Sequence, residues 1–230
     1  MDSQRLAENL ERVRGRIGEA ARRGGRDGGD VRLVAVTKTV ELPVIRRLLA
    51  LGQADVGENR VRALLARAEA LFDAAEEVRW HMIGHLQRNK VRHVLRVARM
   101  LHAVDSLRLA EYIDGRTQAL ELDAEVCIEV NVSGEQSKYG VAAEEAAELA
   151  ERIAAMERVR CVGLMTMAPF VDDAERTRPV FARLRELRDE IRRNVPDCVE
   201  LSMGMSNDYP VAVEEGATIC RIGTALFEGT

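Results

Sequence analysis

The sequence predicts an α/β fold, a single-domain (β/α)8 TIM barrel that spans residues 1–230 and has an extra N-terminal helix. Apolar runs of strand length alternate with longer amphipathic stretches along the whole chain, which is typical of a parallel sheet with crossover helices. There are eight such runs, and 230 residues is an ordinary length for one barrel. No Pro/Gly/Ser-rich linker divides the chain. A doubly wound open sheet would leave a similar pattern and stays an alternative.

The chain begins with a charged amphipathic stretch at residues 4–23, which we expect to form the extra helix, and a glycine-rich turn follows at 24–29. The first expected strand is almost wholly apolar, as strands of parallel sheets are when both of their faces are covered. The eight strands are expected at residues 31–37, 54–56, 80–83, 100–104, 125–131, 159–165, 198–201 and 218–221.

Helices are expected between these strands, and several have residues that commonly begin or end helices. Ser106 is a potential N-cap, Gly52 and Gly216 follow last turns, and Pro196 stands beyond the longest stretch. The expected helices are residues 42–51, 106–120, 142–156, 172–194 and 210–215.

Composition argues against several functional classes. A net charge of -4, a pI of about 5.7 and 3% aromatic residues are unlike a nucleic-acid-binding surface. The four cysteines stand far apart in apolar segments, which indicates reduced core residues and not a metal site or a disulfide framework. No apolar run approaches membrane-spanning length and no secretory leader is visible, so we expect a cytoplasmic protein without membrane contact.

Polar residues follow the carboxyl ends of the expected strands, which form the functional rim of such a barrel. Lys38 comes directly after the first strand, and Asn59 follows the second. A lysine is rarely buried unless it is paired or reacted, and burial can make its amine nucleophilic. Lys38 is therefore either a solvated flank or a residue with a covalent role.

The loops after the last two strands resemble an anion cradle. Gly204 and Gly223 allow close backbone approach, and Ser206 and Thr224 add hydroxyl groups. Each loop leads into a helix start whose N–H groups can bind phosphate, including a short helix expected at residues 225–227. The alternative for each loop is an ordinary N-cap beside a turn glycine.

Arg221 ends the last strand near the same rim. Its planar guanidinium can bind a phosphate or donate to a ring nitrogen, and the alternative is an ion pair with Glu200 or Glu228. His81 is expected to be a hydrogen-bonded core residue, and the orientation of Glu129 stays open. The sequence has no Ser/His/Asp order, HExxH string or P-loop motif.

Strings along nearly the whole chain, in order, closely resemble the pyridoxal phosphate homeostasis protein family. The two longest are the most specific, since chance would rarely produce them. The strings are AVTK at 35–38, GEN at 57–59, WHMIGHLQRNK at 80–90, VNV at 130–132, KYG at 138–140, GLM at 163–165, LSMGMSND at 201–208 and RIGT at 221–224.

The resemblance implies a barrel similar to the N-terminal domain of alanine racemase. It implies that pyridoxal 5'-phosphate (PLP) is bound as an internal aldimine on Lys38, with Asn59 beside the ring. The residues that it implies for the phosphate are Ser206, Gly223 and Thr224.

By the same resemblance, Arg221 would approach the pyridine nitrogen, although it could serve the phosphate instead. An arginine does not readily protonate the ring, so it weakens PLP as an electron sink. Related racemases take a second base from a C-terminal domain, and we expect none in a chain that ends at Thr230.

The expected function is a PLP carrier or buffer that contributes to intracellular vitamin B6 and amino-acid homeostasis without catalysis. One alternative is a PLP-dependent amino-acid racemase or decarboxylase with Lys38 as its base, and another is a cofactor-free Schiff-base aldolase. We expect PLP as the ligand, PLP-requiring apoenzymes as candidate recipients, no nucleic acid or membrane partner, and a monomer that dimerises weakly at most.

Overall fold

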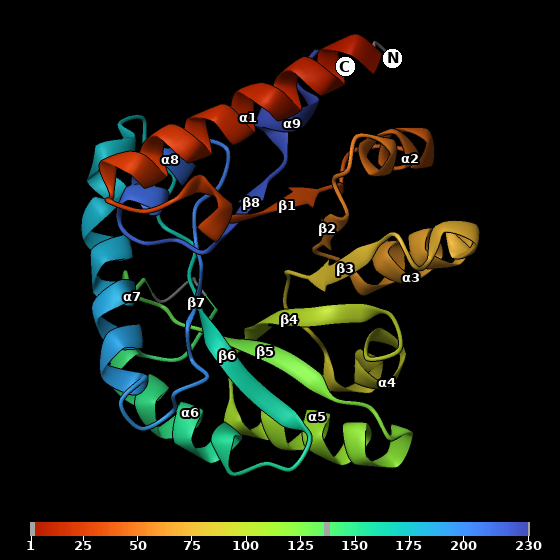
Figure 1. Cartoon of the computed structure of the whole chain (residues 1–230). Coiled ribbons are helices and arrows are strands. Elements are labelled where there is room, and N and C mark those ends of the chain that lie inside the picture. The colour runs from red at the N-terminus through yellow and green to blue at the C-terminus, as the bar shows by residue number, and fades with distance from the viewer. Residues whose placement is uncertain (1–2, 136–138, 230) are drawn as a thin grey trace.

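A closed barrel of eight parallel strands forms the centre of the computed structural model, which describes residues 3–135 and 139–229 (Figure 1). The strands pair in chain order, and the last pairs with the first. They are β1 (Arg32–Val36), β2 (Asp55–Glu58), β3 (Arg79–Met82), β4 (Ala98–Val104), β5 (Ala124–Glu129), β6 (Val159–Met165), β7 (Glu200–Ser202) and β8 (Ile219–Ile222). The (β/α)8 prediction is confirmed, and the open-sheet alternative is wrong. The extent of one domain over residues 1–230 stays a prediction.

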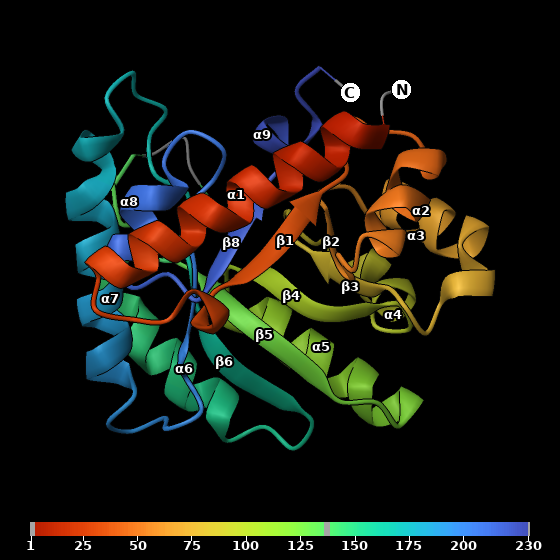
Figure 2. The ribbon, with the colours of Figure 1, turned by 45° about the horizontal axis from the view of Figure 1, so that its top comes forward.

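Helices surround the barrel, and the helix expected before β1 is present. That helix, α1, lies beside α8 and α9 in both views and packs against them (Figures 1 and 2). Its buried stripe has helical spacing, at Leu6, Leu10, Val13 and Ile17. The helices are α1 (Ser3–Arg23), α2 (Leu42–Ala50), α3 (Val61–Ala70), α4 (Val91–Val94), α5 (Leu107–Leu120), α6 (Ala146–Ala154), α7 (Arg178–Ile191), α8 (Tyr209–Glu214) and α9 (Thr224–Phe227).

The structure differs from the sequence prediction at four helices, one of which is α6, expected from residue 142 but α-helical only from Ala146, after the 3-10 turn Ala143–Glu145. The helix ranges given above include neither α3, which buries one side chain completely, nor α4, which is a single turn. The stretch expected as a helix from residue 172 becomes α-helical only at Arg178, because residues 174–177 form a 3-10 turn that Asp173 caps. Pro179 then occupies the first turn of α7, where its missing N–H has little cost.

Apolar side chains of the barrel form two layers, and β1, β4, β5, β6 and β8 contribute to the inner one. On β1, Val34 belongs to the layer inside the barrel, whereas Leu33 and Ala35 belong to the larger layer between strands and helices. This double burial explains the continuous apolar runs of the sequence. The inner layer consists of Val34, Met100, Ala103, Cys127, Val162, Met165 and Ile219.

The four cysteines are free and buried, as the sequence predicts for reduced core residues. Within residues 3–135 and 139–229, no helix combines the length and the apolar character that crossing a membrane requires.

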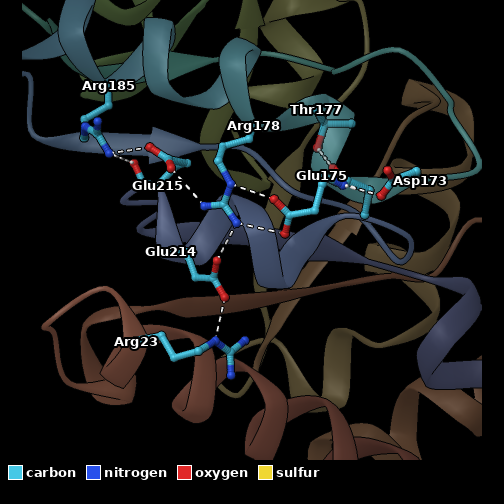
Figure 3. Close-up of polar contacts among 9 residues, drawn as sticks. Arg23, Asp173, Glu175, Thr177, Arg178, Arg185, Glu214 and Glu215 are labelled. Carbon is cyan, nitrogen blue, oxygen red and sulfur yellow. Dashed lines mark hydrogen bonds and ion pairs between the residues drawn. The ribbon is translucent and has the colours of Figure 1, made fainter.

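Arg178 is the centre of an ion-pair network between α7 and α8 (Figure 3). Its guanidinium donates to Glu175 at 2.8 and 2.9 Å, to Glu214 at 2.7 Å and to Glu215 at 2.9 Å. Glu214 also accepts from Arg23, the last residue of α1, at 2.6 Å. The network therefore joins α1, α7 and α8, the last of which follows the loop after β7.

Arg178→Met is expected to lower the free energy of unfolding by about 1–2 kcal/mol, because several charge-assisted bonds to a partly buried side chain outweigh a single surface pair. Arg183→Met on the same helix is the control, since its pairs with Glu186 and Glu190 are longer, at 3.5 and 3.6 Å. That change should stay within about 0.5 kcal/mol in urea denaturation. Equal losses for the two variants would contradict this role of the network.

Candidate functional site

A cavity of about 530 Å³ lies at the carboxyl ends of the strands. All six residues that the sequence indicates line it, namely Lys38, Asn59, Ser206, Arg221, Gly223 and Thr224. The sequence has three lysines, of which Lys90 does not line this cavity and Lys138 lies outside the described residues. The structure thus brings the candidate residues together around one space, with Lys38 as its lysine among the described residues.

The turn that presents Lys38 is fixed at both ends by an arginine. Arg67 of α3 donates through Nη1 to the carbonyl of Thr37 at 2.7 Å and through Nη2 to that of Val40 at 2.6 Å. Glu58, fully buried at the end of β2, accepts from Thr37 Oγ1 at 2.5 Å and from the same arginine. The exposed Lys38 side chain therefore extends from a backbone that is held in place.

Sequence reasoning did not identify Arg67 or assign a role to Glu58. Glu58 stands inside the GEN string at residues 57–59, and that string is the one signal that could have indicated Glu58.

Asn59 follows β2 and packs against a glycine at the end of β3. A Cβ atom on Gly84 would lie 2.3 Å from the carbonyl oxygen of Asn59, so this approach requires glycine. Gly84 lines the same cavity. The close approach of the two loops sets where the Asn59 side chain enters the rim.

The loops after β7 and β8 meet at the start of α9. Ser206 Oγ accepts from the backbone N–H of Ala225 at 3.2 Å, so the first loop caps the helix of the second. Gly223 precedes α9, and a Cβ atom there would lie 3.2 Å from the carbonyl oxygen of Val36. Thr224 is exposed at the first position of α9. The short helix expected at residues 225–227 is confirmed, and Ser206, in the loop after β7, accepts a hydrogen bond from its first turn.

Arg221 is a buried cation with neutral hydrogen-bond partners, and only 4% of the residue is exposed. Its Nη1 donates to Ser202 Oγ at 2.7 Å, and its Nη2 donates to the carbonyl of Thr166 at 2.9 Å. Burial lowers the pKa of this guanidinium.

The expected alternative, an ion pair of Arg221 with Glu200 or Glu228, is wrong. In the part of the chain that the structure describes, Glu200 pairs with Arg32 at 3.6 Å, and no carboxylate lies within ion-pair distance of Arg221. No carboxylate of the described residues pairs directly with this buried charge, and Glu129 and Asp208 act on it only from a greater distance, so its free donors suit an electron-rich ligand group.

Glu129 points to the cavity, which settles the orientation that the sequence left open. It ends β5 and is 4% exposed. Burial raises its pKa from the ordinary 4.5 to about 6, Asp105 adds to the rise, and Arg221 opposes it. The cavity thus contains a carboxyl group that changes charge near pH 6.

Glu129→Gln is expected to reduce the loss of stability that cofactor-free protein suffers as pH rises. Because the folded-state pKa is the higher one, the folded state binds more protons than the unfolded state between pH 4.5 and about 6. The contribution of Glu129 to the free energy of unfolding is therefore fully present below pH 4.5 and is lost as pH rises through about 6. The loss is about 2 kcal/mol by pH 8. Urea unfolding at pH 4.5 and pH 8 checks this, and a difference between variant and wild type that does not vary with pH would contradict it.

The remaining wall of the cavity is mainly apolar. His85 stands at its edge, where Nδ1 lies 3.0 Å from Asp105 Oδ2 and the ring stacks on Tyr139 with centroids 5.0 Å apart. The apolar lining residues are Val36, Ile83, Met167, Ala168, Pro169, Phe170, Val171, Ala174 and Met205. A cavity lined by both polar and apolar side chains suits a flat ligand with a charged substituent. Among the described residues, no group of His, Cys, Asp or Glu is arranged to hold a metal ion.

Comparisons with known proteins agree with these features. The family described as "Alanine racemase, N-terminal domain" matches residues 1–230. A pyridoxal phosphate homeostasis protein of Aquifex aeolicus is 44% identical over 221 residues, which cover 96% of both chains. The human protein of the same name is 38% identical over 231 residues, which cover 95% of this chain and 84% of that one.

Solved structures show the same relationship. PipY of Synechococcus elongatus, in a structure described as having PLP bound, has a TM-score of 0.84 and 33% identity, and the match covers 96% of this chain and 99% of that one. Alanine racemase of Corynebacterium glutamicum has a TM-score of 0.72 at 18% identity over 99% of this chain and 61% of that one, which shows a shared fold alone. The chain therefore belongs to the pyridoxal phosphate homeostasis protein family, whose barrel is that of the alanine racemase N-terminal domain.

Proposed function

We propose that this protein binds PLP through a Schiff base with Lys38 and carries or buffers the cofactor without catalysis, contributing to vitamin B6 and amino-acid homeostasis. The observation that supports this best is the placement of all six candidate residues around one cavity. The names of its relatives, and the PLP described in the PipY structure, point to the same ligand.

The residues present fit PLP, which joins a phosphate, an aromatic ring and an aldehyde. The hydroxyl groups of Ser206 and Thr224 and the open backbone at Gly223 would hold the phosphate. Arg221 would face the ring as a hydrogen-bond donor, and Asn59 would lie beside it. The apolar wall would cover the ring and exclude water.

Bound PLP supplies an electrophilic carbonyl that an amine can attack. The protein's own part is to present the Lys38 amine to this carbonyl and to retain the bound cofactor. Arg67 and Glu58 hold the turn that extends the Lys38 amine into the cavity. Arg221 donates hydrogen bonds but gives up no proton to the ring, so the bound cofactor remains a weak electron sink. This arrangement favours retention over turnover of amino acids.

Racemase or decarboxylase activity is the alternative that the sequence left open. The relatives at 33–44% identity are named as homeostasis proteins, whereas the alanine racemases are similar in fold alone. We therefore propose the carrier role. A cytoplasmic location, PLP-requiring apoenzymes as recipients and a monomeric or weakly dimeric state stay predictions.

Titration of the purified protein with PLP, followed by transfer to a defined apoenzyme, tests the carrier role. We expect a visible absorption band on binding and recovery of apoenzyme activity as the carrier releases its cofactor. Deuterium exchange at the α-carbon of a panel of amino acids should show no uptake of label. Uptake of label would support the racemase alternative, and colourless protein after addition of PLP would contradict the proposal.

A further inference from the structure

A chain of buried hydrogen bonds runs from Arg221 through the inside of the barrel. Arg221 Nη1 lies 2.7 Å from Ser202 Oγ, which lies 2.8 Å from His102 Nδ1. His102 Nε2 lies 2.9 Å from His81 Nδ1, and His81 Nε2 lies 3.0 Å from Asp55 Oδ1. Each distance is within the range of a direct hydrogen bond.

The chain crosses the barrel and does not follow one edge of it. His102 lies on β4 and Ser202 on β7, two strands that are not neighbours in the sheet. Their contact therefore passes through the interior, beside the inner apolar layer. The five residues are all at most 6% exposed, so water competes little for these bonds.

The far end of the chain is anchored by a second arginine. Arg79 donates to Asp55 at 3.0 and 2.6 Å, at the opposite end of the barrel from the candidate site. Burial raises the pKa of Asp55, but the bonds from Arg79 and His81 outweigh it and hold that pKa well below its usual range. Asp55 is therefore a carboxylate and acts only as an acceptor.

The two ends fix the direction of every bond between them. Because Asp55 only accepts, His81 Nε2 must donate, and the neutral ring then accepts at Nδ1 from His102 Nε2. His102 Nδ1 is left as an acceptor for the Ser202 hydroxyl, whose oxygen accepts from Arg221. Burial lowers the pKa of both histidines, in keeping with neutral rings.

We propose that His102 is a positioning residue for Arg221: through the Ser202 hydroxyl it holds the guanidinium so that its remaining donors face the ligand cavity. Asp55 and His81 do not contact Arg221 and act through His102, whose tautomer they fix. The identity of the ligand, PLP, rests on the proposed function, whereas the direction of the chain does not.

Nitrogen NMR of cofactor-free protein labelled in its histidines tests the direction. Both buried rings should be neutral with the proton on Nε2 at pH 7, and Ser202→Ala should perturb the His102 Nδ1 resonance while leaving exposed His93 unchanged. A proton on His102 Nδ1, or a charged ring, would overturn the proposal. The NMR test needs no PLP, so it decides the direction of the hydrogen bonds even if the protein binds no PLP. Failure to bind PLP would contradict the proposed function alone.

The effect on the ligand is tested with PLP-loaded protein. Ser202→Ala and His102→Leu should each speed PLP dissociation by about tenfold and shift the visible band, because Arg221 loses its fixed orientation. His102→Asn can still accept from Ser202 and should stay within about threefold of wild type, as should the control His93→Asn. A purely structural role would instead make His102→Asn and His102→Leu alike.

Ser202→Ala is the least disruptive of these changes and decides the outcome if a histidine variant fails to fold. Wild-type dissociation and an unshifted band in folded Ser202→Ala would refute the positioning role.

Discussion

Lys38→Ala is expected to abolish the visible absorption band that PLP produces with the wild-type protein. The band requires a covalent bond to an amine, and Lys38 is the lysine that lines the cavity among the described residues. Its turn is held by bonds between backbone carbonyls and Arg67, so replacing the side chain should leave the turn and the barrel intact. The variant should therefore retain its unfolding temperature while losing the band.

Lys90→Ala is the matched control for Lys38→Ala. Lys90 is exposed in a 3-10 turn after β3, outside the cavity, and its removal should leave the band unchanged. Persistence of the full band in Lys38→Ala, or its loss in Lys90→Ala, would contradict the assignment of Lys38.

Arg221→Ala is expected to weaken PLP binding by roughly tenfold to a hundredfold, or about 1.5–3 kcal/mol, because one charge-assisted contact is lost. The hydrogen-bond partners of Arg221 are a hydroxyl and a backbone carbonyl, so its removal leaves no ion-paired carboxylate behind. The barrel should remain folded, and the rate of cofactor dissociation reports the change.

Arg32→Ala is a suitable control for Arg221→Ala, since Arg32 starts β1 at the opposite end of the barrel. Its dissociation rate should match that of the wild type. Equal rates for wild type and folded Arg221→Ala would exclude a contact between Arg221 and the cofactor.

The barrel could be predicted from the sequence because parallel strands buried on both faces have continuous apolar runs, and all eight were located to within a few residues. The helix α3 was missed because its buried stripe is weak, with only Leu64 fully buried. The start of α7 was misplaced because a capped 3-10 turn precedes it. Local turn chemistry, and not the apolar pattern, sets such boundaries.

Six site residues could be identified because strand ends converge on one rim and family strings mark them, and the cavity lies among them. Their roles toward PLP stay predictions. Residues that act through tertiary contacts could not be found in this way. Arg67 is one of many helix arginines in the sequence, and only the fold brings it to the Lys38 turn. The contact between His102 and Ser202 joins residues 100 positions apart across the barrel.

Borohydride reduction of the PLP-loaded protein, followed by peptide mass mapping, tests the central claim most directly. Reduction converts the imine into a stable secondary amine, and the sequence offers three lysines for it, Lys38, Lys90 and Lys138. We expect the reduced pyridoxyl group on the peptide that contains Lys38, in a proportion of one per chain. Modification confined to Lys90 or Lys138, or no modification at all, would contradict the account.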